Sequence, residues 1–265
     1  LLFHEKQGCY INFFNYRKFM INKTHKLLLL IASCMFIGLA AHAQTQQPPM
    51  MLGRGAPPPK DYKTPAITEY FTPATATVMT PDAEGFIRRW SLLEPIEKPN
   101  RSNTVFVDSY LREQFNTEYF KNQFTMIPRD GQKVKVGKQT LKWHSLDSKL
   151  FNVKLFRFAT GLKKQQYGIL FWAVTVINAP EDMEVRMAVG SNSASMWWLN
   201  GEEVLLMSGD RRIVMDDCTS KRITLKKGKN ILRGAVINGP GMSDFCVRFL
   251  DEAGKPVTNL TITTE

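Results

Sequence analysis

Histidine, cysteine and long apolar runs are scarce in this chain. The 265 residues include four histidines and four cysteines, and beyond residue 43 only His144, Cys218 and Cys246 remain. One histidine and two cysteines do not supply the ligand spacing of a zinc site. Any Ser-His-Asp or Cys-His mechanism would have to use His144. That residue lies in a strand-like stretch without a nucleophile elbow, which favours a structural role and leaves no catalytic residue to name.

The main apolar run lies near the start of the chain and has the pattern of a signal peptide. A basic segment after Met20 precedes an apolar run of about fifteen residues that ends at Ala41. The run is too short to span a membrane, and a small-x-small cleavage pattern ends at Ala43. We therefore predict an over-extended start (1–19), a signal peptide (20–43) and export to the periplasm or beyond.

A second interpretation of the same run is a lipid anchor. Ile31-Ala32-Ser33-Cys34 is similar to a lipobox, in which Cys34 would carry the lipid. The apolar run continues for seven residues past Cys34, where a lipoprotein sequence would turn polar. Ordinary cleavage is therefore the better interpretation, and no other segment has the length and apolarity of a transmembrane span.

The chain is basic, with 35 Lys and Arg against 24 Asp and Glu and a net charge of +11. Five basic residues and one acid precede residue 44, so the remainder has 30 basic and 23 acidic residues, a net charge of +7. An exported protein rarely meets nucleic acid, and we expect no such partner. The charge indicates either solubility or attraction to acidic polysaccharide.

Beyond the leader, the chain divides into an arm and one domain. Residues 44–85 are rich in Pro, Gln, Thr and Ala, which is typical of a linker or irregular arm. From Phe86 onward, short segments of period two alternate with turn signals. This pattern predicts a single domain over 86–265 with an all-β fold, an antiparallel β-sandwich or jelly roll with one short helix.

Local signals place the expected elements. A helix is predicted over Ser109–Phe120, because apolar and aromatic residues recur there at four-residue spacing. Asn200-Gly201 predicts a hairpin between two apolar runs, and Lys226–Lys229 predicts another. The expected strands are Phe86–Leu92, Lys133–Val136, Thr140–Leu146, Val153–Phe158, Ile169–Ile177, Met183–Val189, Ser195–Leu199, Glu203–Met207, Lys221–Leu225, Asn230–Ile237, Asp244–Leu250 and Val257–Thr263.

Several short motifs follow one another in a characteristic order. They are Arg89–Pro95, Tyr167–Trp172, Met187–Ser191, Trp198-Leu199-Asn200-Gly201, Leu225–Asn230 with the pattern L-x-x-G-x-N, and Asp244–Phe249. In this order the stretch resembles the galactose-binding-like jelly roll associated with secreted polysaccharide-degrading enzymes such as acetylxylan esterases and glycosidases. The resemblance implies a β-sandwich and a role in carbohydrate use, and the functional part is analogy with the family.

Metal binding has weak support. Some members of that family have two acidic residues after the Gly-Ser turn, where this chain has Asn192 and Ser193. Asp216-Asp217 is either part of an oxygen-ligand calcium site or a turn before the next strand, and we favour the turn. No cofactor is therefore expected.

Two adjacent tryptophans are the leading candidates for ligand contact. Side chains of neighbouring strand residues project to opposite faces, so one of the two rings would face away from the core. An exposed ring stacks on the C–H face of a sugar, and nearby planar polar groups orient the hydroxyls. The alternative is that both rings are buried, one in the core and one beneath an N-terminal loop. The predicted ligand-binding set is Trp197, Trp198, Asn200, Asp210, Arg211 and Arg212.

The polar candidates have structural alternatives as well. Asp210 either faces the ligand or pairs with an arginine to fix its loop. A glycosidase would need two carboxylates at a working separation, but acids that follow a hairpin turn are ordinarily solvated. The candidates for such a pair are Glu202, Glu203, Asp210, Asp216 and Asp217.

The two remaining cysteines have two interpretations. In an oxidising compartment Cys218 and Cys246 would form a disulfide. A loop of that size would stabilise the fold by about 3–4 kcal/mol in the chain-entropy model. The alternative is a pair of separate buried thiols.

These observations predict an exported, non-catalytic carbohydrate-binding protein that assists polysaccharide degradation. Its expected partners are a polysaccharide or oligosaccharide and a secreted carbohydrate-active enzyme. Two alternatives stay open, an envelope protein with a protein-binding face and a hydrolase chain related to esterases or glycosidases. A large flat apolar patch would favour the former, and a buried carboxylate pair or a serine-bonded histidine in a cleft would favour the latter.

Overall fold

The computed structural model describes residues 66–100 and 102–265. The predicted signal peptide, the alternative anchor at Cys34 and the first part of the arm (44–65) lie outside these residues. None of the described helices has the length and apolarity to cross a membrane. In chain order the helices and strands are α1 (Ala66–Tyr70), β1 (Phe71–Pro73), β2 (Arg89–Leu93), β3 (Ile96–Glu97), a 3-10 turn (Asn103–Val105), α2 (Asp108–Asn116), β4 (Lys133–Val136), β5 (Gln139–Ser148), α3 (Leu155–Gly161), β6 (Ile169–Ala179), β7 (Met183–Ser191), β8 (Ala194–Leu199), β9 (Glu202–Met207), β10 (Cys218–Leu225), β11 (Gly228–Asn238), β12 (Phe245–Leu250) and β13 (Thr261–Thr263).

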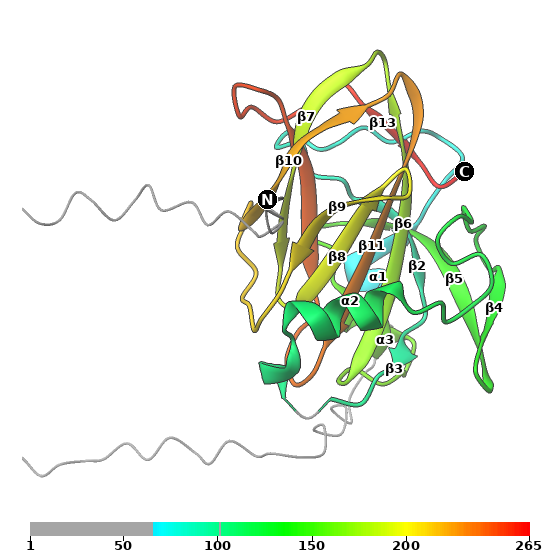
Figure 1. Cartoon of the computed structure of the whole chain (residues 1–265). Coiled ribbons are helices and arrows are strands. Elements are labelled where there is room, and N and C mark those ends of the chain that lie inside the picture. The colour runs from blue at the N-terminus through cyan, green and yellow to red at the C-terminus, as the bar shows by residue number, and fades with distance from the viewer. Residues whose placement is uncertain (1–65, 101) are drawn as a thin grey trace, which may run out of the picture. The chain divides into compact units, whose positions relative to one another are not determined.

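The strands form two sheets in which every pair is antiparallel (Figure 1). The large sheet has the order β1-β5-β2-β6-β11-β8-β9, with β3 and β13 paired to β6 and β4 paired to β5. The small sheet has the order β10-β7-β12. The predicted all-β, antiparallel sandwich is therefore confirmed, but the described residues contain three short helices rather than the one predicted.

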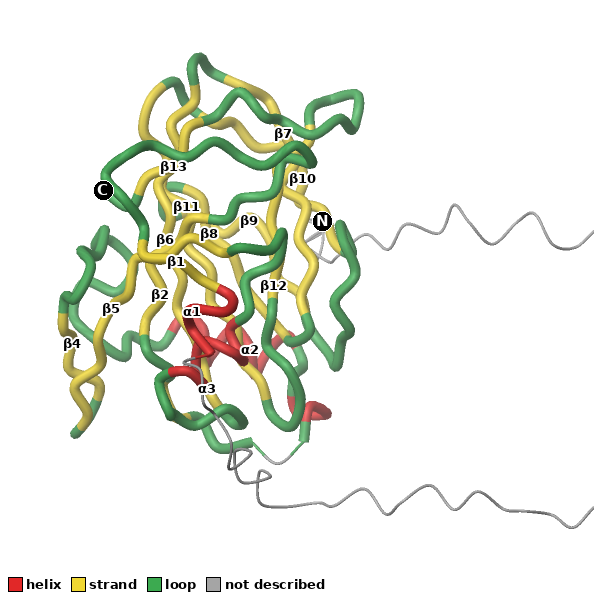
Figure 2. Tube along the Cα trace, turned by 180° about the vertical axis from the view of Figure 1, so that it is seen from behind, coloured by secondary structure: helices red, strands yellow, loops and turns green. Residues whose placement is uncertain are grey.

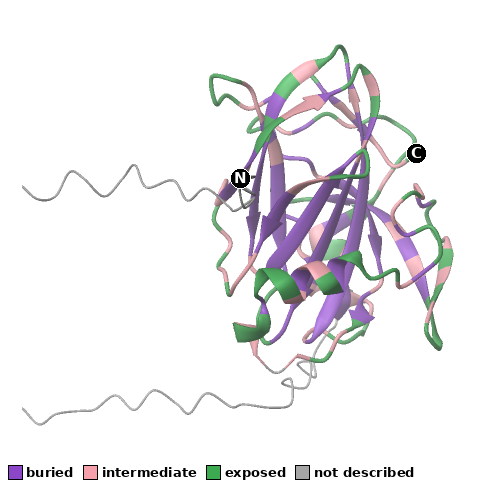
Figure 3. Cartoon of the chain, viewed as in Figure 1, coloured by how far each residue is buried: buried purple, intermediate pink, exposed green. Residues whose placement is uncertain are grey.

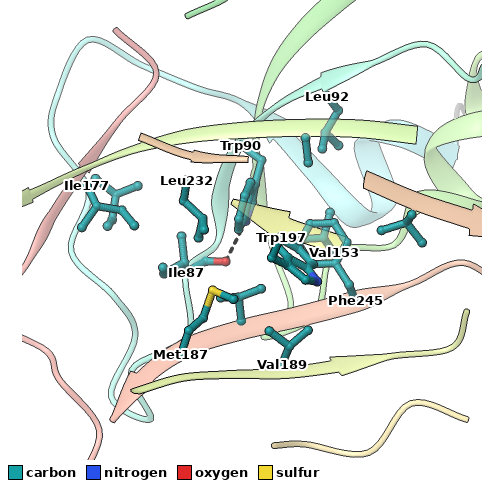
Figure 4. Packing of buried hydrophobic residues seen from close by; sticks show 14 of the residues in the cluster. Ile87, Trp90, Leu92, Val153, Ile177, Met187, Val189, Trp197, Leu232 and Phe245 are labelled. Atoms are coloured by element: carbon teal, nitrogen blue, oxygen red, sulfur yellow. Dashed lines mark hydrogen bonds between the residues drawn. The ribbon is translucent and has the colours of Figure 1, made fainter. Parts of the chain in front are cut away.

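Two apolar layers lie on the two faces of the large sheet. The inner face packs on the small sheet, with Trp90, Trp197 and Phe245 at the centre of that layer (Figure 4). The outer face is covered by α2 and by residues 117–127, which we call the cover segment. Figure 3 shows buried strands behind a helix whose outer side is exposed, and Figure 2 shows the small-sheet side. The buried face of α2 carries Leu111 and Phe115, as the four-residue spacing predicts.

One predicted helix and one predicted strand differ in the structure. The predicted helix over Ser109–Phe120 ends at Asn116, because Thr117 takes an extended backbone with ψ of 127°. The predicted strand over Val153–Phe158 is wrong: most of it is helix α3, which buries Leu155, Phe158 and Ala159. That i, i+3, i+4 pattern is helical. Over only six residues it also resembles the alternation of a strand.

The predicted hairpin around Lys226–Lys229 is also wrong. The turn connects β10 of the small sheet to β11 of the large sheet, and the two strands do not pair. A tight turn reports that the chain reverses direction, but not which strand becomes the neighbour. Of the predicted strand Val257–Thr263, only Thr261–Thr263 forms a strand, and it pairs with β6.

The arm expected to extend to residue 85 is shorter than that. β1 pairs with the edge of β5, and Phe71 is buried in the core. The Arg89 guanidinium makes a two-bond ion pair with Asp147, at 2.7 and 2.8 Å, and its Nη1 donates to the Thr77 carbonyl at 2.5 Å. Residues 66–85 therefore belong to the folded domain, although their Thr- and Ala-rich composition does not show it.

Candidate functional site

Trp197 lies between the two sheets. Its ring centroid is 6.0 Å from that of Trp90 and 5.1 Å from that of Phe245 (Figure 4). The indole Nε1 donates to Ser195 Oγ at 3.0 Å, and the side chain is fully buried. The ring has no face open to a ligand, contrary to the predicted stacking role.

Trp198 lies on the other face of the large sheet and is 5 % exposed. It stacks on Trp172 at 5.4 Å with an interplanar angle of 18°, and Phe124 of the cover segment meets it edge-on at 6.2 Å. The structure therefore corresponds to the second alternative, with one ring in the core and one beneath a segment from earlier in the chain. Sheet geometry explains this, because both faces of the central strands are covered.

Asn200 occupies the β8–β9 turn and serves that turn. Its φ is 53°, its Nδ2 donates to Asn230 Oδ1 at 2.9 Å, and its Oδ1 accepts from the Ile231 amide at 2.8 Å. The six residues of β9 separate it from the β9–β10 loop by about 20 Å. Asn200 and Asp210 consequently lie at opposite ends of β9 (Figure 1), and the predicted set does not form one site.

Arg211 holds its own loop. Its Nε and Nη2 donate to Asp217 Oδ2 at 3.0 and 2.5 Å, and its Nη1 donates to the Ser208 carbonyl at 3.1 Å. An arginine engaged on three atoms within one loop fixes the loop's shape. Arg211 therefore has a structural role rather than the predicted one in ligand contact.

Asp210 and Arg212 lie where ligand could reach them. Both are exposed. Asp210 Oδ1 accepts from Asn103 Nδ2 at 2.6 Å, so its partner is an amide and not an arginine. Within residues 66–100 and 102–265, the Arg212 side chain makes no hydrogen bond or ion pair.

One amide joins three loops at this end of the sandwich. Besides Asp210, Asn103 Nδ2 donates to the Pro240 carbonyl at 3.1 Å, and Asn103 Oδ1 accepts from the Gly239 amide at 3.1 Å. The Gly209 amide donates to the Phe106 carbonyl at 2.8 Å. We call the surface formed by residues 102–107, 208–212 and 239–242 the end surface.

Aromatic and apolar side chains border the end surface. Tyr110 is half-buried, and its hydroxyl donates to Asn100 Oδ1 at 2.9 Å. Half-buried Tyr167 contacts Phe156 at 5.6 Å and adjoins the 239–242 loop, since the Gly168 amide donates to the Gly239 carbonyl at 3.3 Å. The exposed apolar side chains of this surface are Val105, Val107 and Met242, at 40, 54 and 40 %.

A buried carboxylate supports the end surface from below. Asp244 is 1 % exposed, forms an ion pair with Lys154 Nζ at 3.1 Å and accepts from the Phe156 amide at 3.4 Å. Burial raises the pKa of Asp244, and Lys154 opposes that shift. The arrangement ties α3 to the loop after Met242, so that the loop rests on a fixed base.

Three of the five acidic residues considered for metal or glycosidase chemistry form ion pairs with arginines. Asp217 pairs with Arg211, and Asp216 pairs with Arg248 of β12. Glu203 pairs with Arg112 of α2 at 2.5 Å. In the described part of the chain, no three His, Cys, Asp or Glu side chains gather as metal ligands would.

His144 has a carboxylate neighbour. Its Nε2 lies 3.3 Å from Glu94 Oε1, and Lys164 Nζ lies 3.3 Å from Glu94 Oε2. The imidazole packs edge-on against Phe158 of α3 at 5.4 Å. Burial lowers the pKa of His144, although the hydrogen bond to Glu94 opposes the shift. These contacts link β5 to α3 and include no serine or cysteine.

The predicted disulfide between Cys218 and Cys246 is wrong. Cys246 is a free, buried thiol whose pKa burial raises to about 12. Cys218 pairs in register with Val189 and Cys246 with Gly190, on opposite sides of β7. The two side chains therefore lie two strands apart and on opposite faces of the small sheet, at a separation no disulfide spans.

Sequence reasoning missed Asn103, Tyr110 and Tyr167. Asn103 lies in a segment of low periodicity, and its partner Gly239 is 136 residues away. Tyr110 lies in the predicted helix and Tyr167 at the start of a predicted strand motif, which gave no sign of a surface role. Only the 3-10 turn had a local signal, the hydroxyl of Ser102, which accepts from the Thr104 amide as an N-cap.

Comparisons with known proteins reveal no close relative. No protein-family model matches the chain, and no curated protein matches it. Among solved structures, a PA14 sugar-binding domain from an RTX adhesin is similar over 66 % of this chain and 96 % of its own, with 10 % identity and a TM-score of 0.37. The PA14 domain of the MpAFP antifreeze protein is similar over 70 % of this chain and 93 % of its own, with 10 % identity and a TM-score of 0.35.

A third similar structure is the β-glucosidase of Kluyveromyces marxianus in complex with glucose. It has 18 % identity and a TM-score of 0.32, and the match covers 46 % of this chain and 16 % of the enzyme. The chain thus spans a small part of that enzyme's length. At TM-scores of 0.32 to 0.37, these similarities assign neither fold nor function to this chain.

Proposed function

We propose that the chain is a non-catalytic carbohydrate-binding protein whose ligand lies on the end surface. The observation that carries the proposal is the exposed side chain of Arg212, which makes no hydrogen bond or ion pair within the described residues and lies two residues along the chain from Asp210 of the Asn103–Asp210 pair. Planar amide, carboxylate and guanidinium groups are suited to sugar hydroxyls and carboxylates. Two half-exposed tyrosines, Tyr110 and Tyr167, supply aromatic surface at the border.

The loops of the end surface are held before any ligand arrives. Asn238 is fully buried, and its Nδ2 donates to the carbonyls of Gln166 and Gly241 at 2.9 and 3.2 Å. Arg211 fixes the neighbouring loop through Asp217. A site already in its bound shape loses less conformational entropy on binding, which supports recognition by a small number of polar groups.

Export and an accessory role in polysaccharide degradation are part of the proposal. Their support is the signal-peptide pattern over 20–43 and the resemblance of the motif order to modules of secreted carbohydrate-active enzymes. The net charge of +7 beyond residue 43 favours an acidic polysaccharide as ligand.

The proposal is tested by calorimetric titration of the chain beginning at Gln44 with soluble plant and bacterial polysaccharides. All five tryptophans are buried, so intrinsic fluorescence is not a direct reporter of the end surface. We expect saturable binding that Arg212→Ala weakens about five- to tenfold, the effect of one lost hydrogen bond.

The matched control is Lys229→Ala, an exposed basic residue at the opposite end of β11. Both substitutions should leave the melting temperature within about 2 °C of the wild type, since surface changes are small. Equal weakening by both variants would show that net charge, not the end surface, binds the ligand. No binding to any glycan would refute the proposal.

A second candidate function is protein binding by the same surface, favoured by the exposure of Val105, Val107 and Met242. Scattered apolar side chains are common on monomers, so this candidate is second. Loss of a protein partner from periplasmic pull-downs with Val107→Asp, without any glycan binding, would select it.

A further inference from the structure

Unpartnered polar atoms gather beneath the cover segment. Three buried hydrogen-bond donors on the outer face of the large sheet have no acceptor: Trp143 Nε1, Trp172 Nε1 and Arg233 Nε. Buried polar groups are nearly always paired, and each exception calls for an explanation. Among residues 66–100 and 102–265, the other unpartnered buried atoms are single and lie elsewhere, on Arg88, Thr175 and Ser243.

Within the described part of the chain, Arg233 is a buried cation without a counter-ion. It is 3 % exposed, and within the described residues its side chain makes a hydrogen bond only to the Met126 carbonyl, from Nη2 at 2.7 Å. Desolvation lowers the pKa of Arg233 to about 10, so the group is still charged at neutral pH. An unpaired buried charge is costly, and an anion beside it would remove that cost.

The three donors surround the same part of the cover segment. Arg233 pairs in register with Val174, two residues from Trp172, which makes the two side chains diagonal neighbours about 7–8 Å apart. Phe120 contacts both Trp143 and Trp172, at 6.1 and 6.4 Å. Trp172 is therefore a neighbour of Arg233 on the adjacent strand, and Phe120 joins it to Trp143.

We propose that this cluster is a binding site for an oxyanion, either the carboxylate of an acidic sugar or a free anion such as sulfate. A guanidinium and two indole N–H groups are donors only, and charge-assisted bonds to an oxyanion are their strongest complement. Half-buried Phe124 contacts Trp172 at 5.7 Å, and the carbonyl of half-buried Met126 accepts from Arg233. The ligand would enter past these two residues and replace the Met126 carbonyl as the partner of Arg233. The site is independent of the end surface.

The test is thermal unfolding of the chain beginning at Gln44, at matched ionic strength, with sodium glucuronate, sodium sulfate, glucose or sodium chloride. At ten times its Kd, a ligand of the site raises the melting temperature by about 3–6 °C. We expect this from glucuronate or sulfate and not from glucose or chloride. A shift with sulfate alone assigns a free anion, and a shift with glucuronate alone assigns an acidic sugar. No shift with either would overturn the proposal and leave ordered water as the donors' partner.

Two variants locate the response. Trp172→Phe keeps an aromatic ring but removes one hydrogen-bond donor. It should weaken oxyanion binding about five- to tenfold. Arg233→Met should abolish the shift, whereas Arg186→Met, an exposed arginine of β7, should not. If Arg233→Met does not fold, the melting-temperature shift of Trp172→Phe is the test of the site. Arg212→Ala should leave the melting-temperature shift unchanged. If this variant lost the shift, the oxyanion would bind at the end surface instead. A shift retained by Trp172→Phe and Arg233→Met would refute the site.

Discussion

Planar polar side chains in this protein either bind other parts of the chain or face solvent. Which of the two occurs depends on the neighbouring residues. Arg211 and Asn200 have the chemistry of ligand-binding residues, yet both bind their own chain, through Asp217 and through the Ile231 amide. Arg212, one residue further along, remains unengaged and exposed. Residue type alone therefore did not distinguish Arg211, which fixes its own loop, from Arg212, whose side chain is exposed.

The free thiol gives a prediction at this scale. Because burial raises the pKa of Cys246 to about 12, we expect it to react with iodoacetamide far more slowly than an exposed thiol below pH 9, since the thiolate is the nucleophile. The measurement is mass-spectrometric mapping of the labelled peptide. In guanidinium chloride the same thiol should label readily. Rapid labelling of the native protein would show that Cys246 is accessible.

Strands were easier to predict than their partners. β4, β5, β8 and β9 follow from period-two patterns and from the Asn200-Gly201 turn. β10 and β11 also follow, but they belong to different sheets. The reason is that alternation is a property of one strand, whereas pairing depends on residues far away in the chain.

Gly234 shows how an element adapts to its neighbour. It lies in the middle of β11 opposite Trp197, and a Cβ there would be 2.3 Å from the indole Cζ3. We expect Gly234→Ala to lower the free energy of unfolding by about 1–3 kcal/mol, because overpacking forces the ring or backbone to move. The measurement is urea denaturation.

The control for this prediction is the same substitution in a Trp197→Phe background. A smaller ring should reduce the cost of Gly234→Ala, and the double-mutant cycle gives the coupling. An unchanged cost would mean that the indole is not the cause.

The whole molecule joins its layers through a few buried polar contacts. Arg89 and Asp147 secure the segment around Thr77 to the large sheet, and Asp244 with Lys154 secures α3. His144 with Glu94 and Lys164 links β5 to the residues after α3. These pairs lie far apart in sequence, so their loss would affect the domain rather than one element.

His144 makes stability depend on pH. Its pKa is lowered in the folded state by burial, so the unfolded chain takes up a proton first as the pH falls below its ordinary value of about 6.5. The contribution is complete above that pH and is lost between 6.5 and the lower folded pKa. We expect the melting temperature to fall from pH 7 to pH 5 more steeply in the wild type than in His144→Gln. Parallel curves would contradict this origin.

The sequence by itself determined the class of fold. Period-two segments and turn residues are local, so they predicted an antiparallel sandwich without knowledge of any partner. The tertiary structure decided what depends on distant neighbours: the burial of both Trp197 and Trp198, the separation of Cys218 from Cys246, and the meeting of Asn103 with Asp210. Those outcomes follow from which strands pair and which faces are covered, and both are set by contacts between residues far apart in the chain.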